Sequence, residues 1–290
     1  MRQRPLRYRR FLFRRAGGGG GAPAAGGDKP ILVLVEPFAG DAPLFARYNL
    51  TASVSCEKTL AALSAAALER QTTVSAHIKV NTGMNRLGVN VNGAEELAAA
   101  FGRYRGVKLE GIYSHFFAPE EKAALSAQRS AFLLAYRRVK AYNKDIIAHI
   151  SASGGYLAGE HFDMCRIGIL LYGYKPFESD AVAVKPAMSV FAPTVAVRSL
   201  KAGERVLYGA APLERDCTAS VFRYGYADGL PRRKSGRLLN NRCMDLSAAE
   251  GAFEKIDVLQ DAQRTARENG TIVYELLCAA ANRCERVYLR

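Results

Sequence analysis

The sequence of 290 residues contains no tryptophan, only four histidines, and no apolar run of the roughly 18–20 residues that span a bilayer. A membrane-spanning protein is therefore not expected. None of the six cysteines stands in a CxxC pair or at zinc-ligand spacing from a histidine. We expect reduced thiols, with neither a disulfide framework nor a metal site. No signal peptide is recognisable, and we expect the body of the protein to be cytoplasmic.

Acidic residues are absent from 1–15, a segment that holds seven arginines and supplies half of the net charge of +14. Residues 16–28 are low in complexity, with five consecutive glycines. Such a composition buries too little surface to offset the entropy of ordering. We interpret 1–28 as an Arg/Gly-rich arm and linker. The basic run is most simply a solvated one, so a nucleic-acid partner is not expected despite its interleaved aromatic residues.

Apolar runs and helical patterns alternate from residue 29 to about residue 180. Six buried strands are predicted, at 31–35, 51–55, 74–80, 108–115, 145–151 and 166–172. Helical patterns cover 57–70, a segment beginning near 94, and 120–142. Repeated βα units imply a parallel sheet, either open or closed into a barrel. Residues 181–290 are rich in strands and turns, with a helix near 259–268, and predict a second, mainly β domain.

Ordered motifs cover the chain from about residue 29 to its end. The strongest is HIKVNTGMNRLGV at 77–89. It is followed by GIYSHFFAPE (111–120), HISASGGYL (149–157), FDMCRIGILLYGYKP (162–176), PAMSV (186–190), GERVLYGA (203–210), YGYADGLPR (224–232), RCMD (242–245) and TIVYELLC (271–278). In this order they resemble the motifs of the bacterial alanine racemases. These enzymes depend on pyridoxal 5'-phosphate (PLP) and interconvert L-alanine and D-alanine, which supplies D-alanine for peptidoglycan.

The resemblance implies a (β/α)8 TIM-type barrel followed by a β domain. It also implies a homodimer with a shared active site. With six strands found where eight are needed, we expect an incomplete barrel over 29–180 and a shortened β-rich domain over 181–290.

The resemblance implies catalytic roles for three residues. Tyr208 corresponds to a tyrosine that exchanges a proton with the substrate, and His115 to the histidine beside it. Arg166 corresponds to the arginine that faces the pyridine nitrogen. Because arginine keeps its protons, it donates a hydrogen bond without protonating the ring.

Other matches imply binding roles. His149 corresponds to a histidine that orients Arg166. Ser153, Gly168 and Ile169 correspond to contacts of the cofactor phosphate. Arg86 and Met244 correspond to contacts of the substrate carboxylate, and Lys79 corresponds to a lysine that braces Arg86. Tyr208 and Met244 would come from the partner subunit.

Two departures from the family pattern bear on activity. The family's Schiff-base lysine lies in an AVVKANAYGHG-like segment on the first strand, and no lysine of this chain matches it. Asn282 stands where a phosphate-binding tyrosine is usual. The chain is therefore interpreted as a racemase-like protein that is inactive if no other lysine serves. The alternatives are a truncated, non-catalytic relic and a related PLP-dependent amino-acid racemase or decarboxylase.

Overall fold

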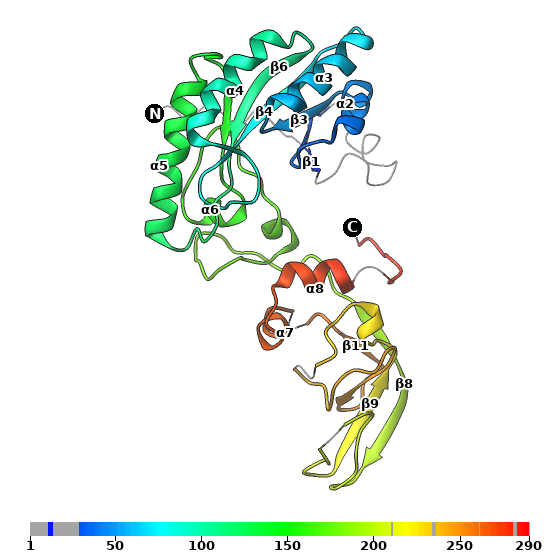
Figure 1. Ribbon diagram of the computed structural model, residues 1–290. Coiled ribbons are helices and arrows are strands. Elements are labelled where there is room, and N and C mark those ends of the chain that lie inside the picture. The colour runs from blue at the N-terminus through cyan, green and yellow to red at the C-terminus, as the bar shows by residue number, and fades with distance from the viewer. Residues whose placement is uncertain are drawn as a thin grey trace. The chain divides into compact units, whose positions relative to one another are not determined.

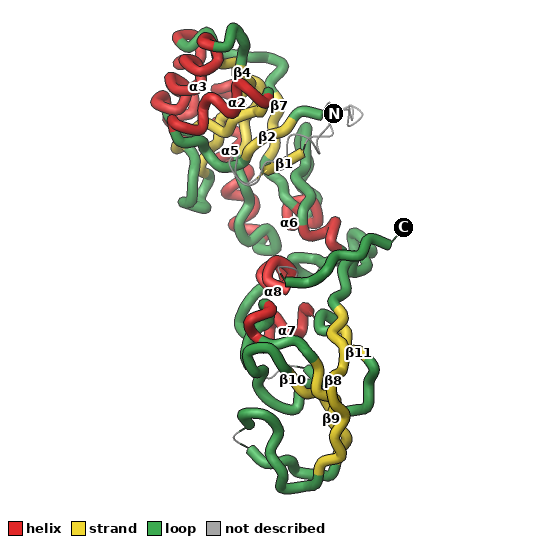
Figure 2. The backbone as a smooth tube through the Cα atoms, turned by 90° about the vertical axis from the view of Figure 1, so that its right-hand side faces the viewer, coloured by secondary structure: helices red, strands yellow, loops and turns green. Residues whose placement is uncertain are grey.

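The computed structural model describes residues 11–13, 29–209, 211–233, 236–260, 262–280 and 283–289. The chain divides into two compact units. The first comprises Met1–Leu171 and Lys175–Val184, and the second comprises Tyr172–Tyr174 and Lys185–Arg290. Figures 1 and 2 show the helices and strands of each unit.

The first unit is built on a parallel sheet that has seven strands within the described residues. Its order is β1-β2-β3-β4-β6-β7, and β5 pairs with β4. The strands are β1 (Phe11–Phe13), β2 (Ile31–Val33), β3 (Leu50–Val54), β4 (Val74–Asn81), β5 (Val89–Asn90), β6 (Val107–Tyr113) and β7 (Ile147–His149). Each central strand carries an almost continuous run of buried residues, as expected when both faces of a sheet are covered. The sheet is a barrel left incomplete, which confirms the predicted fold class.

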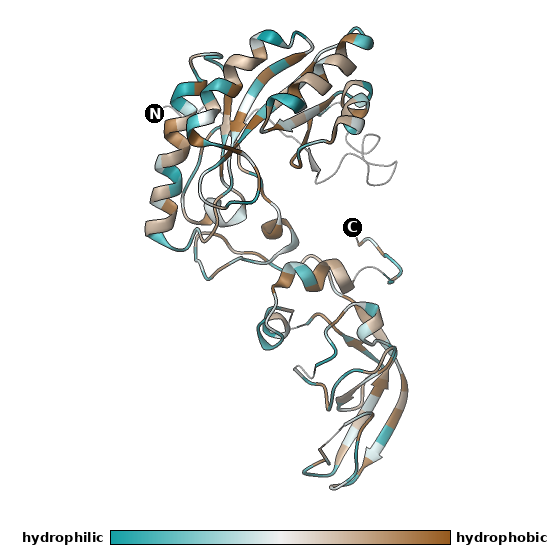
Figure 3. Cartoon of the chain, viewed as in Figure 1, coloured by the Kyte–Doolittle hydropathy of each residue, from teal (hydrophilic) through white to brown (hydrophobic). Residues whose placement is uncertain are grey.

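Helices occupy the crossovers of this sheet: α2 (Ala42–Tyr48), α3 (Glu57–Glu69), α4 (Ala94–Ala100) and α5 (Lys122–Val139). A further helix, α6 (Ser153–Leu157), follows the last strand, β7. α3 packs against β3, β4 and β6, and α5 packs against β6. The buried residues of α5 include Phe132, Ala135 and Val139, whose spacing places them on one side of the helix. Figure 3 shows the resulting pattern, with hydrophobic strands and mixed hydropathy along α5.

Two predictions about this unit were wrong. The apolar run 166–172 is not a strand, because Arg166 makes only an isolated bridge to Ala152, and Ile169–Tyr172 is a 3-10 helix. The proposed arm was expected to be without structure, but β1 lies inside it and pairs in parallel with β2. The remainder of 1–28 lies outside the described residues.

The second unit contains an antiparallel sheet with the order β10-β9-β8-β11. Its strands are β8 (Phe191–Leu200), β9 (Cys217–Phe222), β10 (Ser247–Glu250) and β11 (Lys255–Asp257). Two helices follow, α7 (Ala262–Glu268) and α8 (Val273–Ala280). This agrees with a mainly β domain, although α8 was not predicted. In the part of the chain that is described, no helix combines the length and apolarity needed to cross a bilayer.

Candidate active site

Polar side chains gather where β4, β6 and β7 end. Lys79 lies near the end of β4, His115 follows β6, and His149 is the last residue of β7. Because the strands are parallel, their carboxyl ends meet at one edge of the sheet, where α/β proteins place their sites.

Arg166 is the centre of this group and is 5% exposed. Its NH1 donates to His149 Nδ1 at 2.7 Å. Its NH2 donates to the carbonyl oxygens of Ser114 (2.8 Å) and Ile150 (2.9 Å) and lies 3.1 Å from His115 Nδ1. A guanidinium has five N–H groups. The Nε hydrogen and one NH1 hydrogen therefore have no acceptor among the described residues and are left for another acceptor.

Two side chains behind Arg166 were not predicted from the sequence. His77 is fully buried, and its Nδ1 lies 2.8 Å from His149 Nε2. Tyr113 stacks on His149 with ring centroids 4.8 Å apart and an interplanar angle of 5°. The Tyr113 hydroxyl reaches Ser53 Oγ at 2.7 Å and the Leu34 carbonyl at 3.0 Å. The available signal was a histidine at a buried position of the 74–80 strand.

Burial and positive charge shift the pKa of several groups here. Desolvation, reinforced by Arg166, Arg86 and Lys79, lowers the pKa of His115 to about 3, so its imidazole is neutral at pH 7. Burial raises the pKa of Tyr113 to about 12, which keeps its phenol protonated. Burial lowers the pKa of Arg166 to about 10, and it remains a cation at pH 7.

Lys79 and Arg86 face a small cavity that Thr82, Ser114 and His115 also line. Lys79 is 7% exposed, and its Nζ lies 5.1 Å from the Tyr113 ring centroid. Arg86 is exposed. Burial, together with Arg86 and Arg166, lowers the pKa of Lys79 to about 8. Lys79 and Arg86 thus line one cavity, and the bracing of Arg86 by Lys79 stays a prediction.

The Lys79→Met variant tests this buried ammonium. The folded protein releases the Lys79 proton near pH 8, and the unfolded chain releases it near its ordinary value of 10.5. Between these values the unfolded state binds more protons, so this group makes stability rise with pH, and its destabilising effect is complete below about pH 8. We expect the variant to raise the free energy of unfolding at neutral pH by about 1 kcal/mol. The variant should also show a smaller increase in the free energy of unfolding with pH between about 8 and 10.5. Urea unfolding at a series of pH values from neutral to alkaline measures both effects. Lys108→Met, at an exposed position of β6, is the control.

The three residues predicted to contact phosphate also come together. The Gly168 N–H donates to Ser153 Oγ at 3.0 Å, and Ser153 begins α6. A Cβ placed on Gly168 would meet no atom within 4 Å, so there is open space beside this backbone. Ile169 is buried directly after it. Ser153 and Gly168 thus bring a hydroxyl and an open stretch of backbone to one point.

The remaining predicted site residues belong to the second unit. Tyr208 is 78% exposed and Met244 is 60% exposed. Tyr208 follows Leu207, which has a left-handed φ of 52°. The Met244 carbonyl accepts a hydrogen bond from the Ala227 N–H at 2.9 Å. Asn282 lies outside the described residues.

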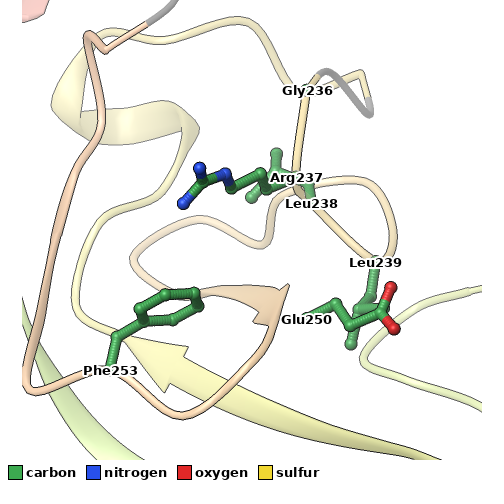
Figure 4. A pocket seen from close by; sticks show the side chains of 6 residues that line it. All are labelled: Gly236, Arg237, Leu238, Leu239, Glu250 and Phe253. Atoms are coloured by element: carbon green, nitrogen blue, oxygen red, sulfur yellow. The ribbon is translucent and has the colours of Figure 1, made fainter.

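A separate pocket in the second unit contains none of the predicted residues. It is lined by Gly236, Arg237, Leu238, Leu239, Glu250 and Phe253. In Figure 4 the Arg237 guanidinium points away from the Glu250 carboxylate, which instead pairs with Arg215 at 2.8 Å. Within the described residues, no group of three or more His, Cys, Asp or Glu side chains is arranged to hold a metal ion.

Fold and site together define a protein with an incomplete parallel α/β barrel, an arginine–histidine cluster at its strand ends, and a following β domain. Family models agree with this division: "Alanine racemase, N-terminal domain" matches residues 14–176, and "Alanine racemase, C-terminal domain" matches residues 187–288. The chain belongs to the alanine racemase family.

Individual relatives support the assignment. An alanine racemase of Staphylococcus epidermidis is 30% identical over 242 residues, which cover 73% of this chain and 63% of that protein. The chain thus spans less than two thirds of that relative. An alanine racemase of Deinococcus radiodurans is 33% identical over 284 residues, covering 89% of this chain and 78% of its own length. The biosynthetic alanine racemase of Pseudomonas aeruginosa superposes with a TM-score of 0.79 at 26% identity, covering 92% of this chain and 81% of that one.

Proposed function

We propose that this chain is an alanine racemase-like protein that binds PLP and alanine at the strand ends of its barrel. The L- and D-alanine interconversion, the supply of D-alanine for peptidoglycan, the cytoplasmic location and the homodimer are parts of this proposal. The observation that carries it is the leftover donor capacity of Arg166. The other hydrogens of this buried guanidinium are engaged by His149, Ser114, Ile150 and His115. Its Nε–H and one NH1 hydrogen are left to donate to an uncharged ring nitrogen.

The residues present fit the non-covalent part of a PLP site. Arg166 would face the pyridine nitrogen and His149 would orient Arg166. Ser153, Gly168 and Ile169 would hold the phosphate, since an unoccupied hydroxyl hydrogen and an open backbone suit an anion. A similar structure, the alanine racemase of Bartonella henselae, is described as holding covalently bound pyridoxal phosphate. In this chain no lysine matches the covalent position, so binding is proposed to be non-covalent.

PLP, when bound, supplies a conjugated ring that accepts the electron pair left at the α-carbon of the amino acid. Arg166 limits that acceptance, because a guanidinium does not give its proton to the ring. This favours racemisation over decarboxylation, which profits from a protonated ring. The amino-acid decarboxylase is therefore the weaker alternative.

The chain's other residues would bind the substrate and move its proton. Arg86 and the backbone of Met244 would hold the alanine carboxylate, and Lys79 would brace Arg86. Tyr208 would take or return the α-proton on one face. Neutral His115 would accept a hydrogen bond beside that phenol. Tyr208 and Met244 would come from the partner subunit.

The experiment compares the binding of PLP and of pyridoxal, which lacks the phosphate, by equilibrium dialysis of the full chain. We expect PLP to bind more tightly, and Ser153→Ala to weaken PLP binding by about threefold to tenfold while leaving pyridoxal unaffected. Ser126→Ala, at an exposed position of α5 in the same unit, is the control. Equal affinity for the two aldehydes would contradict the phosphate site. Absence of PLP binding altogether would favour the non-catalytic relic.

A further inference from the structure

β6 carries one extra residue opposite β4. Ala76 pairs with Leu109 and His77 pairs with Gly111, so Glu110 is a bulge residue between them. A bulge re-aims the side chains of its strand. Here it leaves Glu110 Oε2 3.6 Å from His77 Nε2, with the carboxylate side chain 27% exposed and the imidazole fully buried.

The His77 ring packs directly against the Cα of Gly111, where a larger residue would collide with it. A Cβ at this position would lie 2.3 Å from both Cε1 and Nδ1 of His77. The backbone of Gly111 does not need glycine for its own sake, since its φ is not positive. The bulge and the glycine together leave room for the imidazole between Glu110 and His149.

The proton positions in this group follow from Arg166. A guanidinium can only donate, so His149 Nδ1, at 2.7 Å, must be an acceptor. The single proton of neutral His149 is then on Nε2, which donates to His77 Nδ1 at 2.8 Å. His77 in turn carries its proton on Nε2, which points to Glu110. A second proton on either ring would bring two N–H groups face to face.

We propose that Arg166, His149 and His77 form a one-directional hydrogen-bond chain that ends beside the Glu110 carboxylate, in which both histidines are held as neutral Nε2–H tautomers and Glu110 is a positioning residue for Arg166. The carboxylate attracts the outermost N–H, and each imidazole becomes a better acceptor for the donor before it. The charged groups around the rings are Glu110, Arg166 and Lys79, the last lying over Tyr113. The positioning of Arg166 toward the pyridine ring of PLP rests on the proposed function. The protonation of the two histidines does not.

The test is a side-chain ¹⁵N–¹H correlation spectrum of the full chain without cofactor. Only four histidines contribute, and exposed His161 provides the reference resonance. We expect His77 and His149 to show protonated Nε2 and unprotonated Nδ1 throughout about pH 6 to 8. A protonated Nδ1 on either ring in that range would overturn the proposal.

Substitutions at Gly111 and Glu110 distinguish a positioning role of Glu110 from simple packing around the His77 ring. Gly111→Ala displaces the His77 ring and should abolish the His77 tautomer signature, whereas Gly102→Ala, where a Cβ meets nothing within 4 Å, should preserve it. Glu110→Leu should shift the His77 Nε2 resonance and raise the dissociation constant for PLP by about threefold to tenfold, and Glu110→Gln, which keeps an acceptor, should restore both. If Glu110→Leu leaves the His77 resonance unmoved, Glu110 has no such role. If no PLP binds even in the wild type, the proposed function fails. The spectrum recorded without cofactor still shows which ring nitrogens of His77 and His149 are protonated, and so still tests this inference.

Discussion

Replacing Arg166 by leucine is expected to lower the free energy of unfolding by about 3–5 kcal/mol. The change leaves the Ser114 and Ile150 carbonyls and His149 Nδ1 without their donor, all of them buried. Each unsatisfied buried acceptor costs about 1–3 kcal/mol. Urea unfolding of the full chain, followed by circular dichroism, measures the loss.

Arg129→Leu is the matched control. Arg129 is also paired, through Nε to Glu160 at 2.9 Å, but its side chain is 49% exposed. Exposed pairs contribute about 0–1 kcal/mol, so this variant should unfold close to the wild type. Similar losses in the two variants would show that Arg166 does not organise the strand ends.

The second large effect concerns proton transfer in the presence of PLP. Of the two acid–base groups that a racemisation needs, only Tyr208 is matched in this chain. We therefore expect the full chain to exchange the α-hydrogen of one alanine enantiomer with solvent deuterium faster than that of the other. Net racemisation should be about 10²–10⁴ times slower than in a relative with both groups. Mass spectrometry of each enantiomer in deuterium oxide gives both rates.

Tyr208→Phe should remove the difference between the enantiomers, because the phenol is its source. Tyr288→Phe, at a position 84% exposed in the same unit, is the control and should retain it. Racemisation at the rate of complete relatives, with a pyridoxyl group trapped by borohydride on Lys29 or Lys79, would contradict the prediction. Lys29 or Lys79 would then take the role of the Schiff-base lysine that no residue of this chain matches in sequence.

The roles of the site residues matched in the first unit stay predictions, but the structure shows what brings these residues together. His115 follows β6 and His149 ends β7, so both lie at the carboxyl edge of the sheet, and Arg166 bridges Ala152 just beyond β7. Parallel βα order dictates that convergence once the strands are recognised. For the same reason Lys79 and Arg86 line one cavity.

The secondary structure predicted from local sequence patterns was wrong where contacts with distant parts of the chain determine the backbone conformation. The run 166–172 is apolar enough for a strand, but only Arg166 bridges a neighbour and the chain then turns into a 3-10 helix. A short apolar run does not distinguish these states. Likewise, FLF in the basic arm is too short to predict a strand alone, and β1 exists because β2 offers a free edge for pairing.

By itself the sequence determined the βα order of the first unit and the strand-rich second unit, because these depend on periodicity and residue type. Its ordered motifs also carried the resemblance to the alanine racemases, from which the candidate site residues were taken. Only the tertiary structure decided the rest. The bulge that turns Glu110 to His77, the glycine that admits the His77 ring, and the burial that keeps His115 neutral all arise from the register between β4 and β6 and from packing around Arg166. Register and desolvation are properties of neighbours distant in sequence, and no local pattern encodes them.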